Sequence, residues 1–316
     1  MTSALAFSPG YGLPSWHGSW GSRARSYTRL MGRIERTWGL AKASWRVLNA
    51  DKELLILPVM SLVATIAVAA TFLAPVLLAD DGTTAIRDPG AVGYVLLFVA
   101  YVVLAFIAIF FNAALVHAAN ERLSGGDPSL GSALRGALMR IGRIFTWALV
   151  SATVSIVLRA IEERSGVIGR IAAGIAGVAW SLVTFLVIPV LVIEGVGVGD
   201  AVKRSGALFK TTWGENVAAR VGFGLLGFLA IIPAVVAGTA LFAAGGAVAA
   251  LGLGIVVIWI LTVAMVMSAL SGVFQTALYR YASGIGVEGA AFATSELQAA
   301  FAERPGRKRL PRGFVG

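Results

Sequence analysis

Cysteine is absent from this sequence of 316 residues, and histidine occurs only as His17 and His117. Without cysteine the chain has no disulfide, no thiolate nucleophile and no cysteine-based metal site. Two histidines are too few for a histidine-rich metal centre. Charged residues are also scarce, at 13% of the chain against roughly 25% in soluble domains. We therefore expect no metal and no cofactor.

Apolar residues make up 58% of the chain, and several apolar runs reach the roughly 20 residues that cross a bilayer. This composition predicts an all-α, polytopic membrane protein with six transmembrane helices. We expect the six helices at about 54–78, 92–117, 144–161, 171–193, 217–242 and 247–278. A disordered tail (1–26) would precede the membrane domain (27–281), and a mostly disordered cytoplasmic tail (282–316) would follow it.

A basic, amphipathic helix is predicted at 27–48, within an interfacial segment that extends to residue 53. Its apolar side carries Trp38 and Trp45 at helical spacing, and arginines and lysines cover the rest of the helix. Such a helix can lie on anionic lipid or pack on the cytoplasmic side of the protein itself. The sequence leaves both placements open.

The same order of segments, a basic amphipathic helix followed by two apolar runs, occurs three times. The fold is therefore predicted to be three hairpins of transmembrane helices, each preceded by a basic amphipathic interfacial helix. The units span about 27–118, 127–193 and 199–279. Asp127 and Asp200 follow glycine at the start of the second and third units, where each can cap the next helix. The apolar face of the second such helix is expected to hold Leu130, Leu134, Ala137, Leu138, Ile141 and Phe145. The third is expected to present Val202, Gly206, Phe209 and Trp213 on one side. The expected interfacial anchors of the whole chain are Trp38, Trp45, Phe209 and Trp213.

Charge decides the predicted orientation. The chain holds 26 lysines and arginines for a net charge of +10, and most of them fall on one side of a six-helix topology. Because cytoplasmic loops collect lysine and arginine, we expect both termini in the cytoplasm. The location would be a bacterial plasma membrane, with anionic headgroups of the inner leaflet as partners. This topology explains the basic charge without nucleic acid. A second copy or another membrane protein is a further possible partner.

Three stretches carry a family resemblance: RTWGLAKASWRVLNADKELLILPV (36–59), FFNAALVHAANERLSGGDPS (110–129) and LVTFLVIPVLVIEGVGVGDAVKRSGALFKTTWGENV (182–217). Together they resemble a family of uncharacterised bacterial integral membrane proteins, across about residues 33–280. The pattern of Gly-Asp, amphipathic helix and Trp-Gly is more distantly similar to the membrane domain of some glycerophosphodiester phosphodiesterases. That resemblance implies repeated hairpins and no chemistry, because the soluble catalytic domain is missing here.

Polar residues near the cytoplasmic ends of four predicted helices form the candidate site. Polar groups in or beside a span are costly and usually face an interior or a water-filled cavity. They could line a cytoplasm-facing vestibule, with Glu194 and Arg220 as an ion pair. The alternative is interfacial snorkelling, capping and hydrogen bonding between helices. We call these residues the polar cluster: Asn112, His117, Glu194, Arg220 and Gln275.

Glycines inside the fifth and sixth segments have a structural interpretation. Residues 222–227 match the letters of a dinucleotide fingerprint, yet no strand precedes them and no acidic residue follows at the required distance. Close helix packing is the better interpretation there, and also for Gly246, Ala250 and Gly254 at four-residue spacing.

No nucleophile and base are placed together by the sequence, so we expect no enzymatic activity. The favoured function is a membrane scaffold, or a protein that handles lipid or small solutes. The alternative is a transporter or channel that works through the polar cluster. Transport requires a continuous polar cavity from the cytoplasm to mid-membrane, so Asn112, Glu194 and Gln275 sealed in dry contacts would contradict it.

Overall fold

The structure is a computed structural model that describes residues 45, 53–78, 90–211, 213–243 and 245–285. These residues form helices joined by turns and contain no strand, which confirms the predicted all-α class. The helix predicted at 27–48, apart from Trp45, lies outside the described residues. The loop at 79–89 and the tail at 286–316 lie outside them too.

Six helices within the described residues are long and apolar enough to cross a membrane. The first, α2, has 26 residues, or about 39 Å at 1.5 Å per residue, which exceeds a hydrocarbon core of about 30 Å. The chain is therefore a multi-pass membrane protein, as predicted. The six are α2 (Glu53–Leu78), α4 (Gly90–Leu123), α6 (Ile141–Arg164), α7 (Val167–Val183) with its continuation to Glu194, α10 (Trp213–Ala243) and α11 (Gly246–Ala282).

Several helices are longer than their apolar runs. α4 continues to Leu123 where the sequence indicated an end at 117, and α11 continues to Ala282 rather than 278. α10 begins at Trp213 rather than 217. Backbone hydrogen bonding does not depend on side-chain polarity, so a helix continues past the last apolar residue as long as its next turn can pack.

The predicted fourth span is broken into three pieces. α7 ends at Val183, a turn follows, and the chain resumes as α8 (Val187–Pro189) and a π-helical turn, η1 (Val190–Glu194). Pro189 accounts for the break, because it lacks a backbone N–H and its ring clashes with the carbonyl four residues earlier. A π-helical turn often accommodates such a disruption of the backbone hydrogen bonds.

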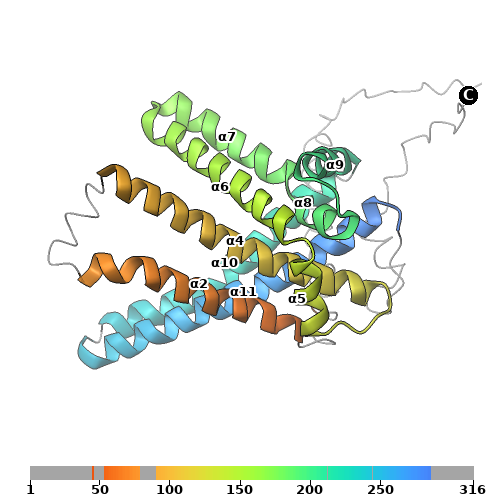
Figure 1. Ribbon diagram of the computed structural model, residues 1–316. Coiled ribbons are helices and arrows are strands. Elements are labelled where there is room, and N and C mark those ends of the chain that lie inside the picture. The colour runs from red at the N-terminus through yellow and green to blue at the C-terminus, as the bar shows by residue number, and fades with distance from the viewer. Residues whose placement is uncertain (1–44, 46–52, 79–89, 212, 244, 286–316) are drawn as a thin grey trace, which may run out of the picture.

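Tight packing is concentrated at one end of the bundle. At this end the starts of α2 and α6 meet the C-terminal ends of α4 and α11, together with α8, η1, α5 (Leu130–Leu138) and α9 (Val198–Thr211) (Figure 1). The largest fully buried side chains all belong to this end: Tyr279, Phe274, Leu57, Leu115, Leu123, Ile144, Leu186, Leu191 and Leu278. We call it the packed end.

Away from the packed end the long helices lie side by side in consecutive pairs. α2 packs along α4, α6 along α7 and α10 along α11, and the α6–α7 and α10–α11 pairs diverge in Figure 1. Their side chains there are apolar and exposed, as with Val92 (75%), Ile168 (85%) and Leu251 (69%). Exposed apolar surface on this scale is expected of helices that face lipid.

The two short helices at the packed end bury mainly small residues. α5 packs on α4 through Ala133, Gly136 and Ala137, while Leu138 is 53% exposed. The predicted α5 face is confirmed at Ala137, which is buried, and at Leu130 and Leu134, which pack half-buried against the core. It was wrong at Leu138, Ile141 and Phe145, which are exposed, and the last two belong to α6.

α9 likewise buries a different row from the predicted one. The buried residues are Ala201, Ser205 and Leu208, whereas Val202 and Phe209 are only half-buried. The buried row is rotated by about one residue because small side chains let the α9 backbone approach the core closely.

Close helix contacts occur at other glycines than those predicted. A Cβ on Gly254 would meet nothing within 4 Å, and Ala250 is exposed. A Cβ on Gly252 would lie 2.5 Å from Leu241 Cβ, and one on Gly238 would lie 2.4 Å from Val256 Cγ2. The prediction of close packing at Gly246, Ala250 and Gly254 was therefore wrong in its positions, since spacing alone does not show which face meets the partner helix.

Candidate functional site

The polar cluster predicted from the sequence lies at the packed end but does not form one vestibule. Asn112 and Gln275 lie where α4 crosses α11, His117 faces α5, and Glu194 faces α9 and α11. Arg220 lies in α10 with a side chain outside the described set. The structure thus separates the described members: Asn112 and Gln275 share one site, Glu194 belongs to a second, and His117 lies apart from both.

The first site is the crossing of α4 and α11. Gly272 forms the crossing point, because a Cβ there would lie 2.5 Å from Leu115 Cδ2 and 3.9 Å from Asn112 Oδ1. Gln275 follows one turn later and is only 9% exposed. Its Nε2 donates to Ser271 Oγ at 3.3 Å. Asn112 Oδ1 and Gln275 Oε1 are both buried without a hydrogen-bond partner, while Asn112 as a whole is half-buried.

The second site ties three elements together through Glu194. Its Oε1 accepts hydrogen bonds from the Tyr279 hydroxyl at 2.8 Å and from Arg204 Nε at 3.2 Å. Tyr279 is 1% exposed, whereas Arg204 and Glu194 retain side-chain exposures of 51% and 25%. The described ion-pair partner of Glu194 is therefore Arg204. The predicted pair with Arg220 stays a prediction, because the side chain of Arg220 lies outside the described set.

Ser205 secures the broken span beside this site. Its hydroxyl donates to the carbonyl of Val183, the last residue of α7, and accepts from the N–H of Leu186 at 3.2 Å. The break leaves these backbone groups without helical partners. A serine on the buried row of α9 therefore replaces the hydrogen bonds that the turn at 184–186 removes.

A buried arginine forms a third site that the sequence analysis missed. Arg280 is 5% exposed, and its Nη1 donates to Asn120 Oδ1 at 2.9 Å and to Ser124 Oγ at 2.6 Å. The bonds join the end of α11 to the end of α4. Asn120 and Arg280 each follow a predicted span within three residues, but the sequence does not show that these two helix ends meet.

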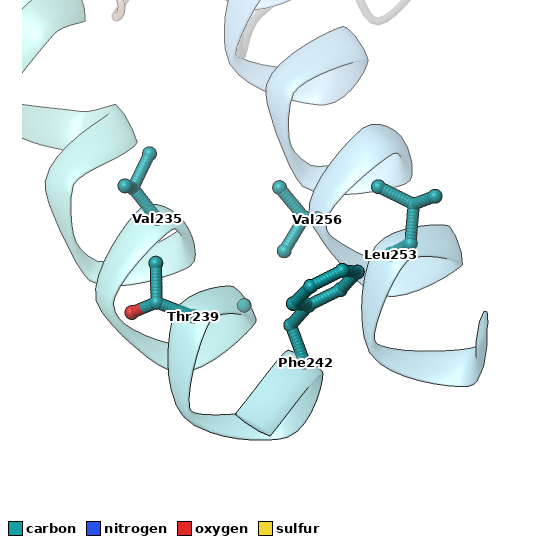
Figure 2. Close-up of a pocket in the computed structure, with 6 residues that line it drawn as sticks. Val235, Thr239, Phe242, Leu253 and Val256 are labelled. Carbon is teal, nitrogen blue, oxygen red and sulfur yellow. The ribbon is translucent and has the colours of Figure 1, made fainter. Parts of the chain in front are cut away.

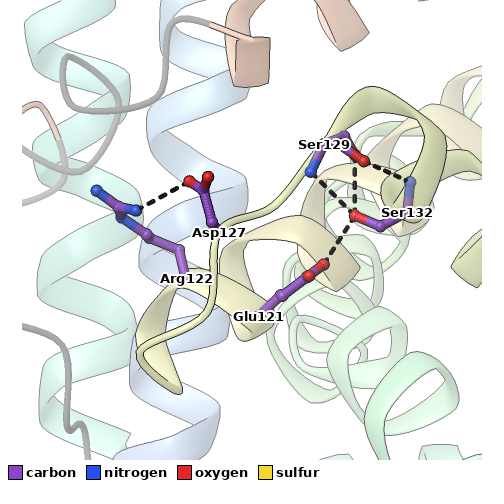
Figure 3. A network of polar contacts seen from close by, with 5 residues as sticks. All are labelled: Glu121, Arg122, Asp127, Ser129 and Ser132. Atoms are coloured by element: carbon purple, nitrogen blue, oxygen red, sulfur yellow. Dashed lines mark hydrogen bonds and ion pairs between the residues drawn. The ribbon is translucent and has the colours of Figure 1, made fainter.

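The turn between α4 and α5 is organised by serine rather than by the predicted aspartate (Figure 3). Ser129 is the N-cap of α5 and forms a capping box with Ser132, whose hydroxyl also donates to Glu121 Oε2 at 2.8 Å. Asp127 instead pairs with Arg122 at 3.4 Å. The predicted caps were wrong for both aspartates, since Asp200 lies inside the first turn of α9.

Two arginines meet the turn that follows η1. Gly195 has a left-handed φ of 66°, and a Cβ on it would lie 3.4 Å from Arg143 Nη1 and 3.8 Å from Arg140 Nε. Arg140 Nη1 donates a long hydrogen bond of 3.4 Å to the Gly136 carbonyl. The Nε of Arg140 is buried without a hydrogen-bond acceptor. A Cβ on Gly136 would clash with the His117 ring, so α5, α4 and α6 converge here.

The predicted interfacial anchors have mixed outcomes. Trp45 is helical and 46% exposed, and Phe209 is half-buried on α9. Trp213 begins α10, but its side chain lies outside the described set, as does the whole of Trp38. Membrane anchoring by these aromatics stays a prediction.

A small hollow lies far from the polar sites, between α10 and α11 (Figure 2). It measures about 300 Å³ and is almost wholly apolar. Thr239, whose hydroxyl donates to its own helix at Val236 O, is the one hydroxyl among its lining residues. Such a surface suits a hydrocarbon chain and offers no catalytic group. The lining is Val235, Gly238, Thr239, Phe242, Leu253 and Val256.

Among the described residues, no group of three or more histidine, aspartate or glutamate side chains could hold a metal ion. A protein-family model described as "Family of unknown function (DUF6159)" matches residues 91–290. Comparison with curated proteins finds no match, and comparison with solved structures finds none either. The expected resemblance to a family of unknown function is confirmed, and this family carries no assigned chemistry to the site.

Proposed function

We propose that this chain, which belongs to the Family of unknown function (DUF6159), is a non-enzymatic membrane scaffold that handles lipid. The observation that carries the proposal is the contrast between its two ends. The packed end holds the large buried side chains and the polar sites, whereas the paired helices beyond it expose apolar residues. Surface of this kind is covered by acyl chains in a bilayer.

In this proposal the six long helices are three hairpins in a bacterial plasma membrane, with both termini and the packed end at the cytoplasmic side. Charge supports that orientation, because more of the described lysines and arginines lie at the packed end than at the α6–α7 turn. Basic residues of the packed end include Arg122, Arg135, Arg140, Arg143, Lys203, Arg204 and Lys210. Those of the α6–α7 turn are Arg159, Arg164 and Arg170, beside Glu162 and Glu163.

Basic residues on α5 and α9 would then meet anionic headgroups, although both helices pack on the protein through their small residues. Leu138 and Met139 are 53% and 68% exposed at the end of α5, where they can enter the interface. The interfacial role of these helices thus combines packing on the protein with contact to lipid.

The alternative function, a transporter that uses the polar cluster, has less support. Asn112 Oδ1 and Gln275 Oε1 are out of contact with solvent. Glu194, which is partly exposed, is engaged by Tyr279 and Arg204. A conducting path needs polar groups that contact water in a continuous cavity, and these contacts favour a scaffold instead.

The experiment is native mass spectrometry of the full chain purified in mild detergent. We expect phospholipid to remain bound, because apolar helix pairs that lack protein neighbours are covered by acyl chains. We also expect a lower unfolding temperature after exhaustive delipidation and recovery on addition of lipid, since a ligand that binds only the folded state stabilises it. A lipid-free protein with an unchanged unfolding temperature would contradict the proposal.

A further inference from the structure

The geometry points to a phosphate-binding site formed by Arg140 and Arg143 against the Gly195 turn. The inference deepens the proposed function and rests on it in one respect, which is that the packed end faces the headgroups of the inner leaflet. The ligand chemistry is a phosphate oxyanion, carried by a phospholipid headgroup or by a soluble phosphate.

Two guanidinium groups converge at this site. Arg140 precedes α6 and Arg143 lies in its first turn, yet both guanidinium groups lie within 4 Å of the position that a Cβ on Gly195, just after η1, would take. Two like charges held against one turn repel each other unless an anion lies between them. Arginine presents several N–H donors in a planar fork that suits phosphate oxygens.

The charges of these two arginines are not neutralised by a carboxylate within the part of the chain that the structure describes. The acidic side chains that the structure describes at the packed end have other partners: Glu194 with Arg204 and Tyr279, Glu121 with Ser132, Asp127 with Arg122 and Asp200 with Lys203. Neither Arg140 nor Arg143 has a carboxylate partner among the described ion pairs.

The site also contains a hydrogen-bond donor without an acceptor. Arg140 Nε is buried without an acceptor, and a buried charged donor left unpaired is costly. α6 also begins without a side-chain cap, so its first N–H groups and its dipole favour an anion in the same place. Arg143 is exposed, which gives a ligand access from the interface.

Gly195 provides a test that separates loss of the site from loss of the fold. Asparagine and aspartate accept a left-handed backbone more readily than other non-glycine residues. Gly195→Asp would place a carboxylate against both guanidinium groups and act as a built-in anion, and Gly195→Asn is its matched neutral control. Arg140→Gln with Arg143→Gln removes the donors, and Arg164→Gln with Arg170→Gln, at the exposed α6–α7 turn, is the charge-matched control.

The experiment measures phosphatidylglycerol retained by the full chain in native mass spectrometry. We expect G195N and the R164Q/R170Q pair to match the wild-type chain, and G195D and the R140Q/R143Q pair to retain about tenfold less, as the loss of charge-assisted hydrogen bonds predicts. G195D should unfold at no lower a temperature than G195N, because the new carboxylate is paired.

A parallel arm uses inorganic phosphate as the probe. If phosphate raises the unfolding temperature of G195N but not of G195D while phosphatidylglycerol retention is equal in both, the site takes a soluble phosphate. Equal retention together with no phosphate-dependent difference would overturn the site. Failure of the proposed function looks different, since the wild-type chain would then retain no lipid of any headgroup, and the phosphate arm would still test the two arginines.

Discussion

Replacing Gly272 by leucine is expected to destabilise the protein by about 3 kcal/mol, at the upper end of what overpacking of a core usually costs. A Cβ at this position would lie 2.5 Å from Leu115 Cδ2 and 3.1 Å from its Cγ. Leu115 is 2% exposed, so its side chain has no free space in which to move. The larger residue must therefore force α4 and α11 apart at the packed end.

The measurement is the free energy of unfolding by denaturant in mild detergent, with Gly254→Leu as the control. Gly254 lies in the same helix, and a Cβ there would meet nothing within 4 Å. Both variants gain the same helix propensity, about 1 kcal/mol for replacing glycine, so their difference isolates the packing cost. Leu115→Ala should restore much of the stability lost in Gly272→Leu, and equal stability of the two glycine variants would refute the crossing.

Replacing Asn120 by leucine is expected to cost about 2 kcal/mol, because Arg280 would lose a charge-assisted hydrogen bond in a buried setting. The bond measures 2.9 Å, and Arg280 is only 5% exposed. Asn120→Asp keeps an acceptor oxygen and supplies a counter-charge, so it should be at least as stable as the wild-type chain.

The corresponding test is a double-mutant cycle with Arg280→Met, followed by the unfolding midpoint in the same detergent. With the charge removed, leucine at position 120 should cost much less than it does opposite arginine. An equal cost in both backgrounds would mean that Asn120 stabilises α4 for reasons other than its bond to Arg280.

The sequence predicts the membrane architecture well because each span is a local property. A run of some 20 apolar residues crosses a bilayer whatever its neighbours are, so six long helices could be expected before the structure was known. The break at residues 184–186 is less local. It depends on Pro189 and on Ser205 of α9, whose hydroxyl supplies the missing backbone hydrogen bonds.

The sequence predicts at which end of the bundle the polar residues lie, but not which side chains they pair with. Asn112, Glu194 and Gln275 lie at the packed end as expected, yet the partners of Glu194 are Arg204 and Tyr279. A helical period places Arg204 on the polar side of α9, but it does not show that a neighbouring turn brings a carboxylate to that side.

Burial of small residues was the least predictable feature. Ala133, Gly136 and Ala201 carry no strong apolar signal, and only the close approach of a partner helix gives them their role. Hydrophobic periodicity instead selected larger neighbours such as Leu138, which is exposed. The same reasoning explains why the close glycine contacts occurred at Gly238 and Gly252 and not at the regularly spaced set.

The central claim is that the helix pairs beyond the packed end face lipid, and oxygen accessibility of spin labels along α4 tests it most directly. The chain has no cysteine, so single cysteines for labelling need no background removal. In lipid bilayers, labels at Val92, Val95 and Val99, which are 75%, 61% and 42% exposed, should show high oxygen accessibility, and labels at Ala114 and Ala118 should show low accessibility. Low oxygen accessibility at Val92, Val95 and Val99, which share one face of α4, would mean that a protein surface covers this face. That result would contradict the claim that the helix pairs face lipid.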